Sequence, residues 1–217
     1  MIISPDMLEI DIVYKDLSIV VVNKPGGLLS VPGRGPHKQD CLVNRIRRLY
    51  PECIPQPSVH RLDMDTSGLM VLALTEKAHR NLSIQFQERT VKKQYTAILE
   101  GIVKGEQGEI NLPFRLDVSN RPYQIYDPVH GKIGTTIWEK KEVIDNQTKI
   151  FFIPVTGRTH QLRLHSYHPM GLGCPITGDR LYGNGKPGEP LLLHACFLSF
   201  KHPEKNQTVC FESPSWF

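Results

Sequence analysis

One run of ten residues, His60–Leu69 (HRLDMDTSGL), sets a histidine, an arginine and two carboxylates beside a Thr-Ser-Gly turn. A carboxylate can act as a nucleophile or as a general acid or base. Asp63 and Asp65 lie two residues apart, so in an extended segment both would face the same side. For Asp65 the pattern favours a plain turn residue. For Asp63 a catalytic role and a structural role both stay open from the residues alone.

A second segment, Thr156–Leu164 (TGRTHQLRL), gathers Arg158, His160 and Arg163. Thr159 is expected to be the N-cap of a helix that runs to about Tyr167. A guanidinium fork in this position could hold the Asp63 carboxylate through two hydrogen bonds, or it could bind phosphate. The alternative is a solvated basic helix end with no ligand.

The Lys92–Tyr95 block and His60 are further candidates for a substrate-binding site. Lys92-Lys93-Gln94-Tyr95 places two cations before a strand aromatic, and such lysines suit phosphates while a tyrosine ring can stack on a base. The alternative for Tyr95 is an ordinary place in the core. His60 is expected to hold the loop through a hydrogen bond rather than to act as a general base.

The composition is that of a globular protein: 217 residues, 40% hydrophobic, with a net charge of +4 that permits nucleic acid as a partner. No apolar stretch reaches the length of about 18 residues needed for a membrane span. The N-terminus is no secretory signal, so a cytoplasmic protein is expected. Gly33–Lys38 (GRGPHK) is not a nucleotide-binding loop, and no H-E-x-x-H occurs. We therefore expect no cofactor and no metal.

The spacing of apolar residues along the chain predicts the strands and helices that must position these residues. Strands are expected over residues 18–23, 69–74, 94–101 and 191–200, and near 208–211. Residues 135–143 and 149–155 predict a hairpin, and helices are expected over 41–49 and 76–88, the second capped by Thr75. Strand-rich segments with a few helices in mixed order predict an α+β fold.

Together, these segments resemble the RluA family of pseudouridine synthases. The likeness is carried by HRLDMDTSGL, by Lys92–Tyr95, by Thr156–Leu164 with Gly178-Asp179 and Leu193-His194-Ala195, and by the opening Asn23–Leu28. It covers nearly the whole chain. The resemblance implies a mixed, mainly antiparallel sheet with flanking helices and a central active-site cleft. It further implies one catalytic domain over residues 1–217, made of two subdomains, without a separate N-terminal RNA-binding domain.

The resemblance also implies roles for single residues. Asp63 would be the catalytic acid, Tyr95 the aromatic that packs on the target base, and Arg163 the partner of the Asp63 carboxylate. Substrate contacts are expected from a wider set: His60, Arg61, Lys92, Lys93, Arg158 and His160. Whether Asp63 acts as nucleophile or base stays open.

The resemblance implies activity on structured RNA as well. The expected substrates of this short, dual-specificity branch are a stem-loop in 23S ribosomal RNA and a tRNA anticodon stem, and the protein is expected to act as a monomer. Two alternatives stay open. One is a non-catalytic RNA-binding protein or RNA chaperone on the same scaffold, and the other a hydrolase that uses Asp63 and Asp65 as a carboxylate pair.

Overall fold

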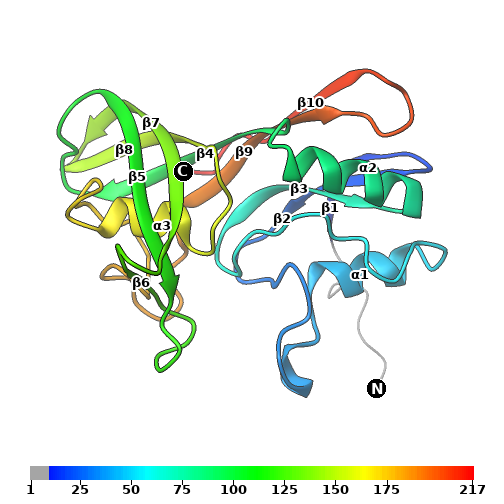
Figure 1. The fold of residues 1–217 in the computed structure, drawn as a ribbon, viewed down its shortest axis with the longest axis horizontal. Helices are drawn as coiled ribbons and strands as arrows, with labels where there is room; N and C mark the ends of the chain where they lie inside the picture. Colours follow the sequence, from blue (N-terminus) through cyan, green and yellow to red (C-terminus); the bar gives the residue numbers. More distant parts are fainter. Residues whose placement is uncertain (1–9) are drawn as a thin grey trace. The chain divides into compact units, whose positions relative to one another are not determined.

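The computed structural model describes residues 10–217, which divide into two compact units (Figure 1). Unit 1 is formed by residues 10–92 together with Ala195–Pro214 from near the end of the chain. Unit 2 is formed by Lys93–His194 and Ser215–Phe217. Strands and helices follow one another in mixed order, which confirms the predicted α+β class.

Unit 1 is built on strands in the spatial order β1-β2-β3-β9, with β10 paired to β9. The strands are β1 (Asp11–Lys15), β2 (Ile19–Lys24), β3 (Ser67–Ala73), β9 (Leu193–Lys201, of which residues 195–201 belong to this unit) and β10 (Thr208–Glu212). The helices are α1 (Leu42–Leu49) and α2 (Glu76–Gln87), with a 3₁₀ turn at Pro36–Lys38. Nearly every residue of β2 and β3 is buried, which explains their unbroken apolar sequences.

Unit 2 is an antiparallel sheet in the order β4-β8-β7-β5-β6 with one helix, α3. The elements are β4 (Lys92–Glu100), β5 (Gln107–Leu116), β6 (Gln124–Tyr126), β7 (Lys132–Ile144), β8 (Gln147–Pro154) and α3 (Gln161–Tyr167). Alternate residues of β4 and β5 enter its core with residues of α3. None of the helices formed by residues 10–217 has the length and apolar content that crossing a membrane requires.

Several local predictions are confirmed. Thr75 caps α2, because its hydroxyl accepts a hydrogen bond from the Ala78 amide at 3.2 Å. The predicted hairpin is β7–β8, and its turn residues Asp145 and Asn146 both have positive φ, as a two-residue hairpin turn requires. The expected strands at residues 18–23, 69–74, 94–101, 191–200 and 208–211 appear as β2, β3, β4, β9 and β10.

Other predictions are wrong or incomplete. Thr159 is not the N-cap of α3: the cap is His160, held in the left-handed conformation at φ 55°, and the helix begins at Gln161. Strands β1, β5 and β6 were not predicted. In β5 the residues Ile110, Leu112 and Phe114 alternate into the core, but Pro113 lies among them and weakens the strand pattern.

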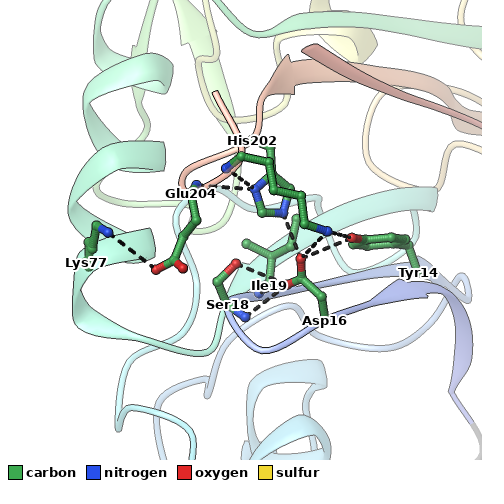
Figure 2. Close-up of polar contacts among 8 residues, drawn as sticks. Tyr14, Asp16, Ser18, Ile19, Lys77, His202 and Glu204 are labelled. Carbon is green, nitrogen blue, oxygen red and sulfur yellow. Dashed lines mark hydrogen bonds and ion pairs between the residues drawn. The ribbon is translucent and has the colours of Figure 1, made fainter. Parts of the chain in front are cut away.

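The Asp16 carboxylate joins the β1–β2 turn to the β9–β10 hairpin within unit 1 (Figure 2). It accepts hydrogen bonds from the amides of Ser18 and Ile19, the hydroxyls of Ser18 and Tyr14, and Nε2 of His202, all within 3.0 Å. The ammonium of Lys205 also lies 3.0 Å away. Partial burial alone would raise the pKa of Asp16, but the bonds from Ser18, Lys205 and Ile19 outweigh it and hold the pKa well below its usual range.

The geometry fixes the tautomer of His202. Its Nδ1 accepts the amides of Glu204 and Lys205 at 3.2 and 3.1 Å, so the proton lies on Nε2 and is donated to Asp16. Because the His202 side chain is almost fully buried, removal of the Asp16 carboxylate would leave the Nε2 proton of His202 buried and unpaired.

We expect Asp16→Asn to lower the free energy of unfolding by about 2 kcal/mol at pH 7, since an amide cannot accept all of these bonds. The folded-state pKa is depressed, so the stabilisation is present above the unfolded pKa of Asp and is lost as pH falls below it. The difference between variant and wild type should therefore shrink toward pH 3 in urea unfolding. Glu204→Gln is the control, because the exposed Glu204–Lys77 pair at 3.8 Å should contribute less than about 0.5 kcal/mol. Equal losses in both variants would contradict the assignment.

Candidate active site

Asp63 lies half-buried on the loop that precedes β3, and the backbone on both sides of it is anchored. On one side, the Ser30 hydroxyl donates to the Leu62 carbonyl at 2.6 Å and accepts from the Leu62 amide at 3.1 Å. On the other side, the Met64 carbonyl accepts the Gly27 amide at 2.9 Å. These bonds hold the backbone on both sides of Asp63 without using its carboxylate.

A fully buried lysine, Lys24 at the end of β2, is hydrogen-bonded to the same loop. Its ammonium donates to the carbonyls of Pro25 and Leu28 at 2.8 Å and to that of Met64 at 3.0 Å. Burial lowers the pKa of Lys24 to about 7, while the carboxylates of Asp65 and Asp63 act in the opposite direction. The ammonium of Lys24, which is bonded to this loop, therefore loses its proton as the pH rises through about 7. The sequence analysis assigned Lys24 no role.

We expect Lys24→Met to lower about tenfold or more the rate of any reaction that depends on Asp63, because three carbonyls lose their donor and Met64 is no longer held in place. Methionine retains the length and the apolar stem of the side chain. Hydrogen exchange of the Gly27 amide, which bonds Met64, should speed up in the same variant. The control is Lys38→Met at an exposed position, and comparable losses in both variants would rule out the loop-bracing role.

The Thr-Ser-Gly segment after Asp63 is not a turn, because Ser67 and Gly68 lie in β3, but its glycine is required. Gly68 has a φ of +110°, and a Cβ there would overlap the backbone of Ala195 on β9. Gly26 is similarly constrained, since a Cβ would lie 3.0 Å from the Asp65 carbonyl oxygen. The close approach of three chain segments thus explains glycines that the sequence pattern showed only as a turn.

His60 is an anchor of the loop, as expected. Its Nε2 accepts the Val71 amide of β3 at 3.1 Å, and its ring stacks on Phe86 of α2 with centroids 4.4 Å apart. Arg61 is exposed, as a contact with RNA would require. Substrate contact by either residue stays a prediction.

In unit 2, Arg163 forms a buried, bidentate ion pair with Asp179. Nε and Nη2 of Arg163 lie 2.7 and 2.5 Å from the two carboxylate oxygens, and both side chains are almost completely buried. Burial would raise the pKa of Asp179, but the Arg163 guanidinium and the amides of Tyr182 and Leu181 hold it below its usual value. The sequence analysis did not foresee this partner, and the pairing of Arg163 with Asp63 stays a prediction.

Tyr182 completes the surroundings of Arg163. Its ring centroid lies 5.3 Å from the guanidinium carbon, and its hydroxyl lies 2.8 Å from Nδ1 of His160. His160 is itself buried, so this hydrogen bond gives it a positioning task that the sequence analysis did not assign. Its predicted contact with substrate is untested.

Gln161 organises the TGRTHQ segment around α3. Its side-chain carbonyl accepts the Thr156 hydroxyl at 2.6 Å and the Arg158 amide at 3.0 Å, and its amide group donates to the Thr135 carbonyl and the Thr136 hydroxyl. The Arg158 side chain is exposed and bonds the Ile133 carbonyl at 3.3 Å. A buried glutamine therefore gives this segment its conformation, a task that the sequence analysis left unassigned.

The Lys92–Tyr95 block forms the start of β4. Lys92 is exposed, whereas Lys93 is half-buried and desolvation lowers its pKa. Tyr95 is half-buried, lies opposite Phe152 of β8 and packs against the core of unit 2. Among residues 10–217 there is no group of three or more histidine, cysteine or acidic side chains placed to hold a metal ion.

Comparison with known proteins now gives the class of protein. Residues 18–168 match the family described as RNA pseudouridylate synthase, and the chain belongs to this family. It is 44% identical over 212 residues to the dual-specificity RNA pseudouridine synthase RluA of Haemophilus influenzae, which covers 96% of this chain and 94% of that protein. The protein of the same name from Escherichia coli (strain K12) is 44% identical over 210 residues, covering 95% and 93%.

A solved structure agrees with the sequence comparisons. Human RNA pseudouridylate synthase domain containing 1 matches with a TM-score of 0.76 at 27% identity, covering 99% of this chain and 86% of that one. The family and the fold predicted from the sequence are thereby confirmed.

Proposed function

We propose that this protein isomerises specific uridines to pseudouridine in stem-loops of 23S ribosomal RNA and in a tRNA anticodon stem. The observation that supports it most is the anchored loop of Asp63 in a chain 44% identical to a dual-specificity RNA pseudouridine synthase. In this proposal the protein acts as a monomer in the cytoplasm and needs no cofactor.

The reaction is an isomerisation. The bond between N1 of uracil and C1′ of the ribose breaks, the base turns, and a bond forms between C5 and C1′ while a proton leaves C5 and one is gained at N1. The target uridine must first leave its stack, which costs a few kcal/mol. Contacts of the exposed Arg61, Lys92 and Arg158 with phosphates would offset this cost and make binding sensitive to salt.

We assign the catalytic carboxylate to Asp63, which can act as nucleophile or base. Tyr95 stacks on the target base, and Arg163 keeps the carboxylate charged and oriented. Asp63 belongs to unit 1, and Tyr95 and Arg163 belong to unit 2. The family resemblance supports their acting on the same uridine.

The function is tested by incubating the protein with total RNA from a strain that lacks its gene, followed by mapping of new pseudouridines as carbodiimide adducts. New adducts at stem-loop uridines would support the proposal. RNA that is bound but unchanged would favour an RNA-binding protein or chaperone instead. Free uracil among the products would favour a hydrolase.

The role of Tyr95 leads to a graded prediction. If stacking is its main task, Tyr95→Phe should retain turnover within about tenfold of the wild type, while Tyr95→Ala should lose about a hundredfold. Single-turnover kinetics on a mapped RNA would measure both. Because Tyr95 also packs against the core, urea unfolding should confirm that the alanine variant is folded. A larger loss for phenylalanine than for alanine would refute stacking.

A further inference from the structure

A pocket of about 690 Å³ lies within unit 2, where β6 and the loop before it approach the loop that follows α3 (Figure 1). Three tyrosines line it: Tyr123, Tyr167 and Tyr182. The Tyr123 ring meets that of Tyr182 edge-on at 5.9 Å, and the Tyr167 ring is tilted against it at 6.2 Å. Flat aromatic surfaces of this kind stack on nucleobases of any sequence.

The pocket has a rigid part and an accessible part. Tyr182 is buried, and its hydroxyl accepts the Gln124 amide at 2.8 Å while it pairs with His160. Tyr123 and Tyr167, by contrast, are 38% and 47% exposed. Two accessible rings around a fixed one give a stacking surface that needs little ordering when a ligand enters.

The polar groups of the pocket are mainly hydrogen-bond acceptors. The amide nitrogen of Asn120 donates to Asp117 at 3.0 Å, and that of Asn184 donates to Glu100 at 2.7 Å. Both asparagines therefore keep a carbonyl oxygen for a ligand, whereas both oxygens of the Asp117 carboxylate already accept hydrogen bonds from Ser119 and Asn120. Adenine, guanine and cytosine carry an exocyclic amino group that such acceptors recognise, whereas uracil does not.

Two arginines lie beside this pocket, whose lining also carries the Asp117 carboxylate, so contacts with the phosphates of a nucleotide fall to the arginines. Arg121 and Arg180 are exposed, and each lies in sequence beside residues that line the pocket. Arginines in such positions commonly contact backbone phosphates, while the groups in the pocket read the base.

We propose that this pocket binds an unpaired, amino-bearing nucleobase of the RNA substrate, separate from the uridine that is isomerised. The inference rests on the proposed function and extends it to substrate selection. The pocket is also connected to Arg163. The amides of its lining residues Leu181 and Tyr182 donate to Asp179 at 2.8 and 3.0 Å, and Asp179 is the ion-pair partner of Arg163. A base seated against Tyr182 would brace the Arg163–Asp179 pair.

The first test is ultraviolet crosslinking of the whole protein to an unmodified transcript of a tRNA anticodon stem-loop, with the joined peptides identified by mass spectrometry. We expect peptides that contain Tyr123 or Tyr167 to carry an adenine, guanine or cytosine nucleotide. Crosslinks confined to other peptides would overturn the inference.

The second test is kinetic. Tyr123→Ala and Tyr167→Ala should each raise KM for the transcript roughly tenfold, while the phenylalanine variants stay near wild type. Trp216→Ala is the control, because this tryptophan is 63% exposed and does not line the pocket. An unchanged KM in both alanine variants would overturn the pocket assignment.

The two tests separate this inference from the proposed function. A wild type that crosslinks through these tyrosines but forms no pseudouridine would support the pocket and refute the function. A wild type that forms pseudouridine, with no crosslink at Tyr123 or Tyr167, would refute the pocket alone.

Discussion

Asp63→Asn is expected to abolish pseudouridine formation, to less than about one part in a thousand of the wild-type rate, while RNA affinity stays within a few-fold. The substitution keeps the size of the side chain and removes the charge that a nucleophile or base requires. The loop should keep its conformation, because Ser30 and Lys24 anchor it through the carbonyls of Leu62 and Met64. Tritium release from RNA labelled at C5 of uridine measures the rate, and filter binding measures the affinity.

Asp65→Asn is the matched control, since it makes the same change two residues further along the loop. The sequence pattern favours a turn role for Asp65, so its variant should retain at least about a tenth of the activity. Near-normal turnover in Asp63→Asn would refute the catalytic assignment. Equal loss in both variants, with release of free uracil, would instead indicate a carboxylate pair that cleaves the glycosidic bond.

Local patterns were sufficient to predict much of the fold. The apolar runs of β2 and β3 needed no tertiary information, since strands buried on both faces read as unbroken hydrophobic stretches. Thr75 before the helical period of α2 is a purely local signal, and so is the Asp145-Asn146 turn. The predicted position of Asp63 on a short connection before a buried strand followed from the same signals.

What was missed depends on contacts between residues distant in sequence. Lys24 ends an apolar strand and reads as an exposed cation, yet it is buried, and the carbonyl of Met64, forty residues away, accepts a hydrogen bond from its ammonium. Asp179 reads as a loop residue, and only the fold brings it to Arg163. His160 takes a left-handed conformation that no pattern of side chains near Thr159 indicates.

The pairing of Arg163 with Asp179 also changes what a mutation at Arg163 would test. With only Asp63 as its expected partner, a loss of activity would report on that carboxylate alone. With Asp179 bonded to Nε and Nη2, the guanidinium is held in a fixed orientation before any substrate binds. A guanidinium held in this way depends on its planar fork, not only on its charge.

We therefore expect Arg163→Lys to lower kcat about a hundredfold or more, because an ammonium cannot bridge both oxygens of Asp179 as the guanidinium beside the Tyr182 ring does. The variant should also lose about 3 kcal/mol of unfolding free energy, since the buried Asp179 is left with an incomplete partner. Steady-state kinetics at a temperature where the variant is fully folded by circular dichroism separates the two effects.

Arg158→Lys supplies the matched control within the same segment. Arg158 is exposed and makes a single side-chain bond to a carbonyl, so a lysine should keep turnover within a few-fold and stability within about 0.5 kcal/mol. Full activity of folded Arg163→Lys would remove the guanidinium from the mechanism. A loss in Arg163→Lys that matched its lower stability alone, and vanished on cooling, would leave the Arg163–Asp179 pair as a structural element of unit 2.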